Sequence, residues 1–455
     1  MVDFDLNVGF SRIEINPPMG VNITGYFHKR YAEGILDDVE INTIAIKKDG
    51  NAVLLITLDA METTNAFCDV TRRAIAKATG VNEEGIFIHI THTHTGITFD
   101  VPEKMELDIE KEYIAWAIEN ICLSAKQALD DASPARMGIA FSKAERVAFN
   151  RRYLMKDGSV QTNPGVNNPD IVKCIGLLDE TVNVIRFERK VGDNIVIANF
   201  GNHPDVIGGN LISADWPGFT RRIFERAVEN SKCVFFNGAL GDINHVNVAP
   251  KGGDFNGMFN DFDDVSRGYA HSRHIGNVVA GAILSVFEKT EFIPTKSISY
   301  IQRKIAIPSN MPNPEDIPNA RYINEMHTSG RDSELPYQGM MLTTVVAEAE
   351  RMLRLENGPT YFDMMLSGIR LGDVAFIGIP GEPFAGVGLG LKQTKGYKMV
   401  CTTSITNGYE GYFPIADSYE EGGYEARSSI YKAGVAETII KEGKNLLIDL
   451  KNERK

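Results

Sequence analysis

The chain has 455 residues, of which 43% are hydrophobic and 24% charged, and its 60 acidic against 47 basic side chains give a formal net charge of −13. This composition is that of a globular protein with enough apolar material for a sizeable core. The acidic balance, with no cluster of lysine and arginine, argues against nucleic acid as a partner, because phosphate binding needs a concentrated basic surface.

The predicted elements alternate between strand-like apolar runs and amphipathic helical runs. In chain order they are strands at 43–47 and 52–59, a helix at 63–78, a strand at 86–90, a helix at 107–129, strands at 182–188 and 194–199, a helix at 216–229, a strand at 233–236, a helix at 265–289, a strand at 297–307, a helix at 334–355, a strand pair within 362–378 and a helix at 428–447. Interleaving of this kind indicates an α/β (α+β) protein with a mixed β-sheet core covered by helices.

Two stretches read as irregular. Residues 248–264 are rich in Gly, Asn and Asp, and residues 309–339 are rich in Pro and polar side chains. Long irregular segments inside a compact domain are often functional loops. Both stretches keep aromatic residues, unlike flexible linkers, so we expect a single domain over residues 1–455.

The sequence lacks the features of exported and membrane proteins. Residues 1–6 contain no basic segment followed by an apolar one, so we expect no signal peptide. No apolar run approaches the roughly 18 residues of a membrane span, so we expect no integral membrane association. The five cysteines are scattered in apolar sequence, which predicts reduced, buried thiols in a cytoplasmic protein. The oligomeric state is left open.

The most informative motif is Thr91-His92-Thr93-His94-Thr95-Gly96, which follows the predicted strand 86–90. Alternate residues of a strand share a face, so His92 and His94 are predicted to point the same way. Two such imidazoles can both bind a metal, or one can bind while the other moves a proton. The ordinary alternative is a pair of polar residues at a solvated strand end.

Two further motifs at predicted strand ends offer metal ligands. His203 follows the strand 194–199 and precedes Pro204, which holds the histidine in extended geometry. Glu382 lies in a Pro-Gly turn after an apolar run. Either residue alone is as readily a loop side chain. Together with His92 they complete a set of two histidines and a carboxylate, which leaves a position open for water.

Other polar segments supply groups that can act beside a metal. Residues 409–424 hold four tyrosines, including Tyr412 and Tyr424, and a phenol can donate a proton, hydrogen-bond an oxyanion or ligate a metal. Arg151 offers a cationic clamp, and Asp242 offers a carboxylate that can orient its neighbours. The alternatives are an aromatic surface, a solvated loop and a turn residue, respectively.

An acidic run at Asp261-Phe262-Asp263-Asp264 raises the question of a second cation such as Mg²⁺ or Ca²⁺. Its spacing fits no cation-binding loop such as the EF-hand. A solvated acidic loop is therefore the favoured interpretation.

Taken in their order along the chain, these motifs resemble the neutral/alkaline ceramidase family, specifically its N-terminal catalytic domain. Residues 9–20, with Gly25-Tyr26 downstream, are similar to the start of that domain. Residues 91–96 match its Thr-His-Thr-His-Ser-Gly motif in all but one residue, and residues 211–218 are similar to the segment after its second histidine site. The resemblance extends from the N-terminus to about Tyr424.

The resemblance implies one catalytic zinc ion, held by four ligands: His92, His203, Glu382 and Tyr412. His94 would lie beside the metal as general base or proton shuttle. Arg151 and Tyr424 match the residues that hold the substrate carbonyl or its developing oxyanion. Gly25 and Asn244 are assigned to substrate binding, and Asp242 to orienting the groups around it.

Two departures from the family affect the expected substrate. Asn244 stands where ceramidases have the serine of a Gly-Asp-x-Ser turn, and we expect neither the secretory leader nor the additional C-terminal domain of that family. We therefore predict a zinc-dependent hydrolase that cleaves an amide, or an ester, in a small soluble substrate. The alternatives are a metal-dependent lactonase or sugar-modifying enzyme on the same scaffold, and a non-catalytic binding protein, which Asn244 favours.

Overall fold

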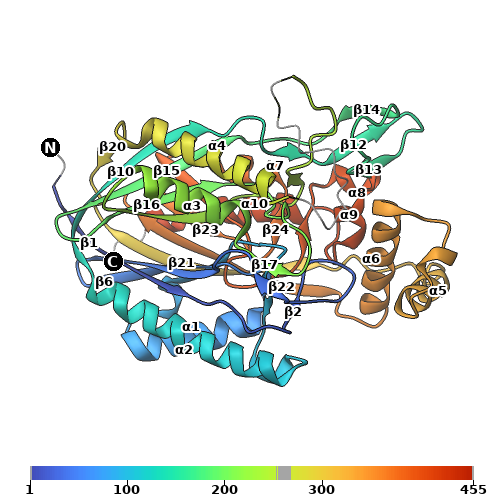
Figure 1. Cartoon of the computed structure of the whole chain (residues 1–455), viewed down its shortest axis with the longest axis horizontal. Helices are drawn as coiled ribbons and strands as arrows, with labels where there is room; N and C mark the ends of the chain where they lie inside the picture. Colours follow the sequence, from blue (N-terminus) through green and yellow to red (C-terminus); the bar gives the residue numbers. More distant parts are fainter. Residues whose placement is uncertain (1–2, 253, 255–267, 453–455) are drawn as a thin grey trace.

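Two β-sheets form the centre of the computed structural model, which describes residues 3–252, 254 and 268–452 (Figure 1). The larger sheet has nine strands in the order β18-β16-β15-β10-β1-β5-β6-β8, with β20 beside β10. Their bounds are β1 (Leu6–Glu14), β5 (Glu40–Lys48), β6 (Asn51–Leu58), β8 (Ile86–Ile90), β10 (Ser133–Lys143), β15 (Thr181–Arg189), β16 (Asn194–Phe200), β18 (Ser231–Asn237) and β20 (Glu291–Ile293). The smaller sheet has the order β21 (Ile298–Pro308), β22 (Tyr361–Leu371), β23 (Val374–Gly378) and β25 (Met399–Thr403).

Both sheets are mixed, as predicted. Most neighbouring strands are antiparallel, but the pairs β6/β8, β16/β18 and β23/β25 are parallel. One apolar cluster lies between the sheets and combines Leu55 and Phe87 of the larger with Phe376 and Cys401 of the smaller. Removing a side chain such as Phe87 from water contributes about 1.5–3 kcal/mol. The two sheets therefore share one core, and their strand ends are held in fixed positions.

Helices cover the outer faces of the sheets. Their bounds are α1 (Asn65–Thr79), α2 (Asp108–Asp130), α3 (Asp215–Ala227), α4 (Tyr269–Phe287), α5 (Ile317–Thr328), α6 (Gly339–Leu355), α7 (Ala385–Lys392), α8 (Asp417–Glu421), α9 (Tyr424–Ser428) and α10 (Val435–Asn452). Helices α1 and α2, and separately α3 and α4, pack on the larger sheet, whereas α7 and α10 pack on the smaller. Helices α5 and α6 form a hairpin with an apolar cluster of their own, at the right of Figure 1.

Several predicted elements are confirmed with their local causes. The Thr64 hydroxyl accepts a hydrogen bond from the Phe67 amide at the start of α1, and Gly80 ends the helix with a φ of 76°. The hairpin β5/β6 turns at Asp49-Gly50, where both residues have positive φ.

In the C-terminal third, the bounds of two helices and the structure of one stretch differ from the prediction. The helix predicted at 334–355 begins only at Gly339, because Pro336 disfavours helical geometry in the residue before it. The last helix begins at Val435 rather than at residue 428, after Gly434 with a φ of 101°. The stretch 309–339, predicted as irregular, contains α5, whose buried side chains recur every three residues from Ile317 to Met326. The run 261–264, most of 248–264 and the first residues of the helix predicted at 265–289 lie outside the described residues.

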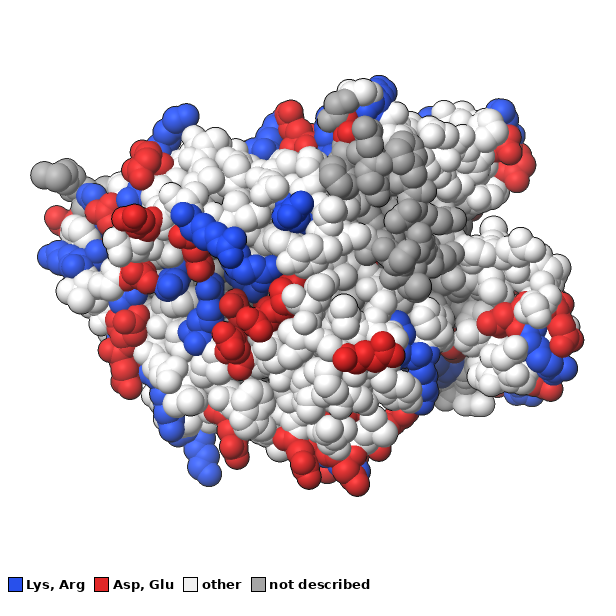
Figure 2. Space-filling model, viewed as in Figure 1, with Lys and Arg blue, Asp and Glu red and all other residues white. Residues whose placement is uncertain are grey.

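The surface and the cysteines agree in part with expectation. Figure 2 shows lysine and arginine interspersed with aspartate and glutamate on the face it presents. All five cysteines are free, but Cys174 is exposed and Cys122 is only partly buried, so the expectation that each thiol is buried is wrong for these two residues. No helix among the described residues has both the length and the apolar character that a bilayer span requires. The cytoplasmic location and the single-domain boundary stay predictions.

Candidate metal centre

The predicted ligands converge where the parallel strand pairs end. Strand β8 leads into the turn that carries His92 and His94, β16 leads into His203, and β23 leads into Glu382. Carboxyl ends of parallel strands point to one edge, where α/β proteins commonly place their ligands. In the described sheets, β8, β16 and β23 are not paired with one another, so these distant residues meet because the two sheets pack together and bring the strand ends to one place.

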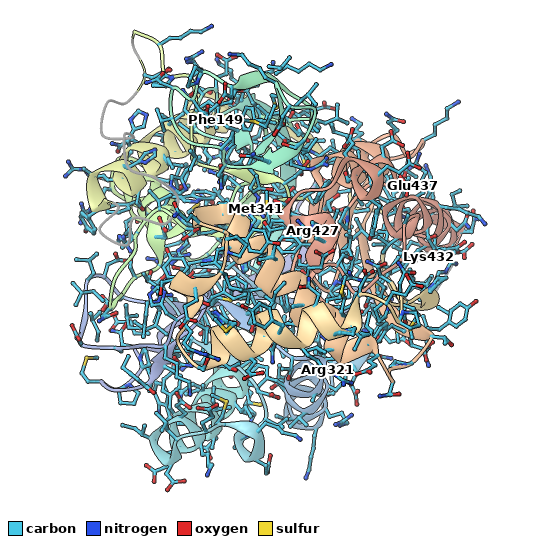
Figure 3. The ribbon with its side chains drawn as sticks, turned by 90° about the vertical axis from the view of Figure 1, so that its right-hand side faces the viewer. Phe149, Arg321, Met341, Arg427, Lys432 and Glu437 are labelled. Atoms are coloured by element: carbon cyan, nitrogen blue, oxygen red, sulfur yellow. The ribbon has the colours of Figure 1, made fainter. Side chains whose placement is uncertain are left out.

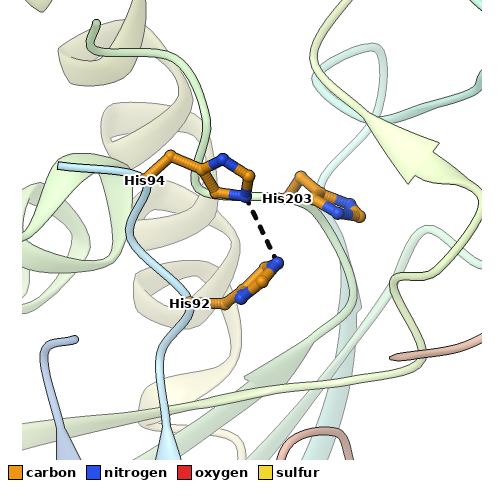
Figure 4. Close-up of side chains that lie close together, drawn as sticks. All are labelled: His92, His94 and His203. Atoms are coloured by element: carbon orange, nitrogen blue, oxygen red, sulfur yellow. Dashed lines mark hydrogen bonds between the residues drawn. The ribbon is translucent and has the colours of Figure 1, made fainter. Parts of the chain in front are cut away.

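The turn after β8 brings His92 and His94 together in a way that strand geometry does not explain. Strand β8 ends at Ile90, and His92 has a φ of 73°, a left-handed conformation that costs energy for a non-glycine residue. The two Nε2 atoms lie 3.3 Å apart (Figure 4). The prediction that both rings point to one place is confirmed, but its stated reason, alternation along a strand, is wrong.

Backbone carbonyls fix the orientation of two imidazole rings. Nδ1 of His92 lies 2.6 Å from the Met61 carbonyl oxygen, and Nδ1 of His203 lies 2.7 Å from that of Ile243. A carbonyl only accepts hydrogen bonds, so each Nδ1 is assigned the proton and each Nε2 keeps its lone pair. Ligand nitrogens of His92, His94 and His203 all lie within 4.8 Å of one another, and all three residues are buried. This arrangement of ring partners is the one that proteins use to orient metal-binding histidines.

Glu382 completes the cluster and shows why a cation fits it. Its Oε2 atom lies 2.9 Å from His203 Nε2 and 3.6 Å from His92 Nε2. Both Glu382 Oε2 and His203 Nε2 are buried without a hydrogen-bond partner. At 2.9 Å the two atoms form an ion pair when His203 Nε2 carries a proton, and without that proton a cation is needed between them. Two imidazoles and a carboxylate form a donor set suited to zinc, which would bind both atoms.

Burial controls the charge of this cluster. It lowers the pKa of His92 to about 4 and that of His94 to about 3, so both rings are neutral near pH 7 and can offer lone pairs. Burial alone would raise the pKa of Glu382, but His92 and His203 lower it well below its usual range and keep the carboxylate ionised.

These shifts predict a pH dependence of the metal-free protein. Unfolded histidine has a pKa near 6.5, so between about pH 4 and pH 6.5 the unfolded chain binds more protons than the folded one. We therefore expect the free energy of unfolding to rise with pH across this window, by up to about 1.4 kcal/mol per pH unit for each such histidine. Urea unfolding at pH 5 and pH 6.5 checks this, with His94→Gln as comparison. An equal slope in wild type and variant would contradict it.

Three side chains without a predicted role hold the predicted groups in place: Asp205, Tyr409 and Glu425. Asp205 Oδ1 lies 3.6 Å from His94 Nδ1 and accepts a hydrogen bond of 2.7 Å from the Tyr26 hydroxyl. The Tyr409 hydroxyl donates to Glu382 Oε1 at 2.8 Å. Asp205 lies only two residues after the candidate ligand His203, and this proximity in sequence could have predicted its place in the site.

Arg151 is held by the third unassigned residue, Glu425. Its Nε donates to Glu425 Oε1 at 2.6 Å, and its Nη2 donates to the Gly241 carbonyl at 2.7 Å. Both side chains are buried. The Thr162 hydroxyl donates to the other oxygen of Glu425, at 3.0 Å. The guanidinium is therefore fixed before any substrate binds.

One cavity of about 320 Å³ collects most of the residues predicted to act on substrate. Its lining includes Gly25, His94, Arg151, Tyr412 and Tyr424. The Arg151 guanidinium lies 5.6 Å from the centre of the Tyr412 ring, and the Tyr412 and Tyr424 rings meet edge to face. Burial raises the pKa of both tyrosines, so their phenols stay protonated and able to donate hydrogen bonds.

Backbone geometry determines the positions of Gly25 and Tyr412 in the site. Gly25 has a φ of 101°, and a Cβ atom there would lie 2.8 Å from His94 Nδ1, so the position needs glycine. Tyr412 begins the short strand β26 (Tyr412–Phe413), which pairs in parallel with β24 (Glu382–Pro383) and sets Tyr412 opposite Glu382.

Asp242 and Asn244 are buried in the turn after β18 but have different surroundings. Asp242 accepts hydrogen bonds from Asn150 Nδ2 and the Ala385 amide, both at 2.7 Å, and so ties the strand before Arg151 to the start of α7. Asn244 donates to Asn163 Oδ1 at 2.9 Å and is not among the described residues that line the cavity. A contact between Asn244 and substrate therefore stays a prediction without support from this geometry.

Comparison with solved structures identifies the architecture. The neutral ceramidase from Pseudomonas aeruginosa matches with a TM-score of 0.75 and 18% sequence identity, over 99% of this chain and 75% of that one. A ceramidase complexed with C2 matches with a TM-score of 0.73 and 17% identity, over 99% of this chain and 76% of that one. No model of a known protein family matches the sequence, and no curated protein matches it. The chain therefore has the fold of the neutral ceramidases.

Proposed function

We propose that this protein is a zinc-dependent hydrolase that cleaves an amide bond, or an ester bond, in a small-molecule substrate. The observation that carries the proposal is the convergence of three buried donor atoms: His203 Nε2 lies 2.9 Å and His92 Nε2 lies 3.6 Å from Glu382 Oε2. In this proposal the zinc ligands are four residues: His92, His203, Glu382 and Tyr412. When bound, zinc supplies a Lewis acid that polarises a carbonyl and makes water a nucleophile near neutral pH.

His94 is proposed as the general base rather than as a fourth nitrogen ligand. Of the three clustered histidines, His94 is the one that lines the cavity. Asp205 lies behind its Nδ1 atom and favours a proton there, which leaves Nε2 to accept a proton from the attacking water. Tyr26 holds Asp205 from the other side.

Arg151 and Tyr424 are proposed to stabilise the oxyanion that forms when water adds to the carbonyl carbon. Both line the cavity, and Glu425 fixes Arg151 in advance. Donors placed before the reaction lose no reorganisation energy during it, and each contributes roughly 3 kcal/mol to transition-state stabilisation. The alternative of a binding protein without catalysis gives no account of why a base and two donors line one cavity next to a ligand cluster.

The test is hydrolysis by the zinc-loaded protein of N-acyl amides, esters, lactones and acyl sugars, with and without a chelator. We expect amide or ester cleavage that chelation abolishes and zinc restores. His94→Gln should retain zinc and lower kcat by about 10²–10⁴-fold, the usual contribution of a general base. Loss of zinc in this variant would make His94 a ligand instead. Cleavage of lactones alone would favour the lactonase alternative. If no substrate is turned over, the hydrolase proposal fails and the non-catalytic binding protein is the remaining alternative.

A further inference from the structure

The cavity that contains His94 adjoins a second cavity and shares part of its lining with it. The outer cavity has a volume of about 470 Å³, and Phe27, Tyr412 and Tyr424 line both cavities. His94 and Arg151 line only the inner one. A substrate that fills both cavities therefore passes the two tyrosines, with one end beside the proposed catalytic groups and the other end in the outer cavity.

The inner cavity has an apolar wall. Phe27 comes from the N-terminal segment, and Met340 and Leu342 come from the first turn of α6, on either side of Met341, which is labelled in Figure 3. Apolar side chains bind an apolar group by removing its surface from water. In the proposed reaction the inner cavity thus suits the acyl group.

The outer cavity is polar and carries both signs of charge. Its lining includes Asn65, Glu350, Arg354 and Glu410, together with the rings of Phe362 and Tyr409. A hydrocarbon chain placed here would cover amide, carboxylate and guanidinium groups without replacing their hydrogen bonds to water, at a cost in free energy. Because acids and arginines are mixed, neither a simple anion nor a simple cation gains a clear advantage.

Glu350 and Arg354 are two charged groups in this cavity that are free of ion pairs with the described residues and so can bind a ligand. They lie four residues apart on α6, where side chains share a face. Neither forms an ion pair within 4.0 Å with a described residue, not even with the other. The Arg354 guanidinium lies 5.9 Å from the centre of the Phe362 ring. An acceptor and a planar donor, one helical turn apart beside an aromatic ring, suit a ligand with several hydroxyl groups on a compact frame.

We propose that the outer cavity binds a hydroxylated amine portion of the substrate, such as an amino sugar, so that the protein hydrolyses an N-acyl amino sugar or a close analogue. This inference rests on the proposed function. Glu350 accepts hydrogen bonds from the ligand hydroxyls, and Arg354 donates to them. In the reaction water adds to the carbonyl carbon, the C–N bond breaks, and the amine leaves with a proton while the acyl group becomes a carboxylate.

The experiment compares N-butanoyl glucosamine with N-butanoyl butylamine on the zinc-loaded protein. The two share an acyl group and differ in the amine. We expect kcat/KM to favour the amino sugar by at least about tenfold, since a site built for hydroxyls rejects a group that lacks them. Glu350→Ala and Arg354→Ala should raise KM for the amino sugar about tenfold, with little change in kcat and little effect on the butylamide. A preference for the butylamide, or an equal loss on both substrates, would overturn the proposal.

Arg321→Ala is the matched control. Arg321 is labelled in Figure 3, lies on α5, pairs with Glu356 and lines neither cavity, so this variant should behave as wild type. If neither amide is hydrolysed, the proposed amide hydrolysis fails, and calorimetry of glucosamine binding then tests the outer cavity independently of turnover. Binding to wild type that both α6 variants lose supports the proposal, and absence of binding overturns it.

Discussion

Replacing His203 with alanine is expected to abolish zinc binding and, with it, turnover. The His203 ring is oriented by the Ile243 carbonyl and lies 2.9 Å from Glu382 Oε2, so alanine removes a donor from the centre of the cluster. Loss of groups that merely orient a ligand costs about 10–100-fold in affinity or activity, and loss of the ligand itself should cost more. Elemental analysis should fall from about one zinc per chain to almost none.

The control for this result is His327→Ala. His327 lies on α5, where Nδ1 contacts Asp332 at 3.0 Å, and it is outside the histidine cluster. It should keep its zinc, and circular dichroism should show that both variants are folded. Full zinc occupancy in His203→Ala would refute the ligand assignment and the mechanism built on it.

The second large effect concerns stability. Asp59, at the end of β6, accepts two hydrogen bonds from the Arg221 guanidinium of α3, at 2.9 and 2.5 Å, and one from the Thr91 hydroxyl at 3.2 Å. Both charged side chains are buried. Asp59→Ala should lower the free energy of unfolding by about 3–5 kcal/mol, because it leaves a guanidinium buried beside fewer partners. Urea denaturation of the zinc-free protein measures this directly.

Arg321→Ala again serves for comparison, because it breaks an ion pair at the surface. The Arg321 side chain is 63% exposed, so its pair with Glu356 should contribute only about 0–1 kcal/mol. A loss below about 1 kcal/mol in Asp59→Ala would show that Glu40, 3.1 Å from Arg221, already neutralises the guanidinium.

The fold was predictable wherever local chemistry decides it. Thr64 and Gly80 mark the ends of α1, and Asp49-Gly50 marks a hairpin. Helix α5 was missed because Pro318 and the polar residues around it read as loop, although Pro in the first turn of a helix is favourable. Its stability comes from the apolar cluster that it shares with α6, which a local pattern does not reveal.

The residues that converge at the candidate site were predictable, but the side chains that hold them in place were not. His92, His203 and Glu382 each follow an apolar run, so each signals a side chain displayed at a strand end. Asp205, Tyr409 and Glu425 act only through contacts made across the folded structure. The order of strands in the sheets decides those contacts, and pairing between distant strands leaves little trace in a single sequence.

The origin of the ligands from three separate parallel strand pairs has a consequence for assembly. His92 follows β8, His203 follows β16 and Glu382 follows β23, so no short fragment of the chain carries all three. If the proposed function holds, zinc has a high-affinity site only in the fully folded chain, and by mass action each tenfold excess over Kd adds about 1.4 kcal/mol to the stability of the chain. Zinc uptake during refolding would then record the moment at which the two sheets dock.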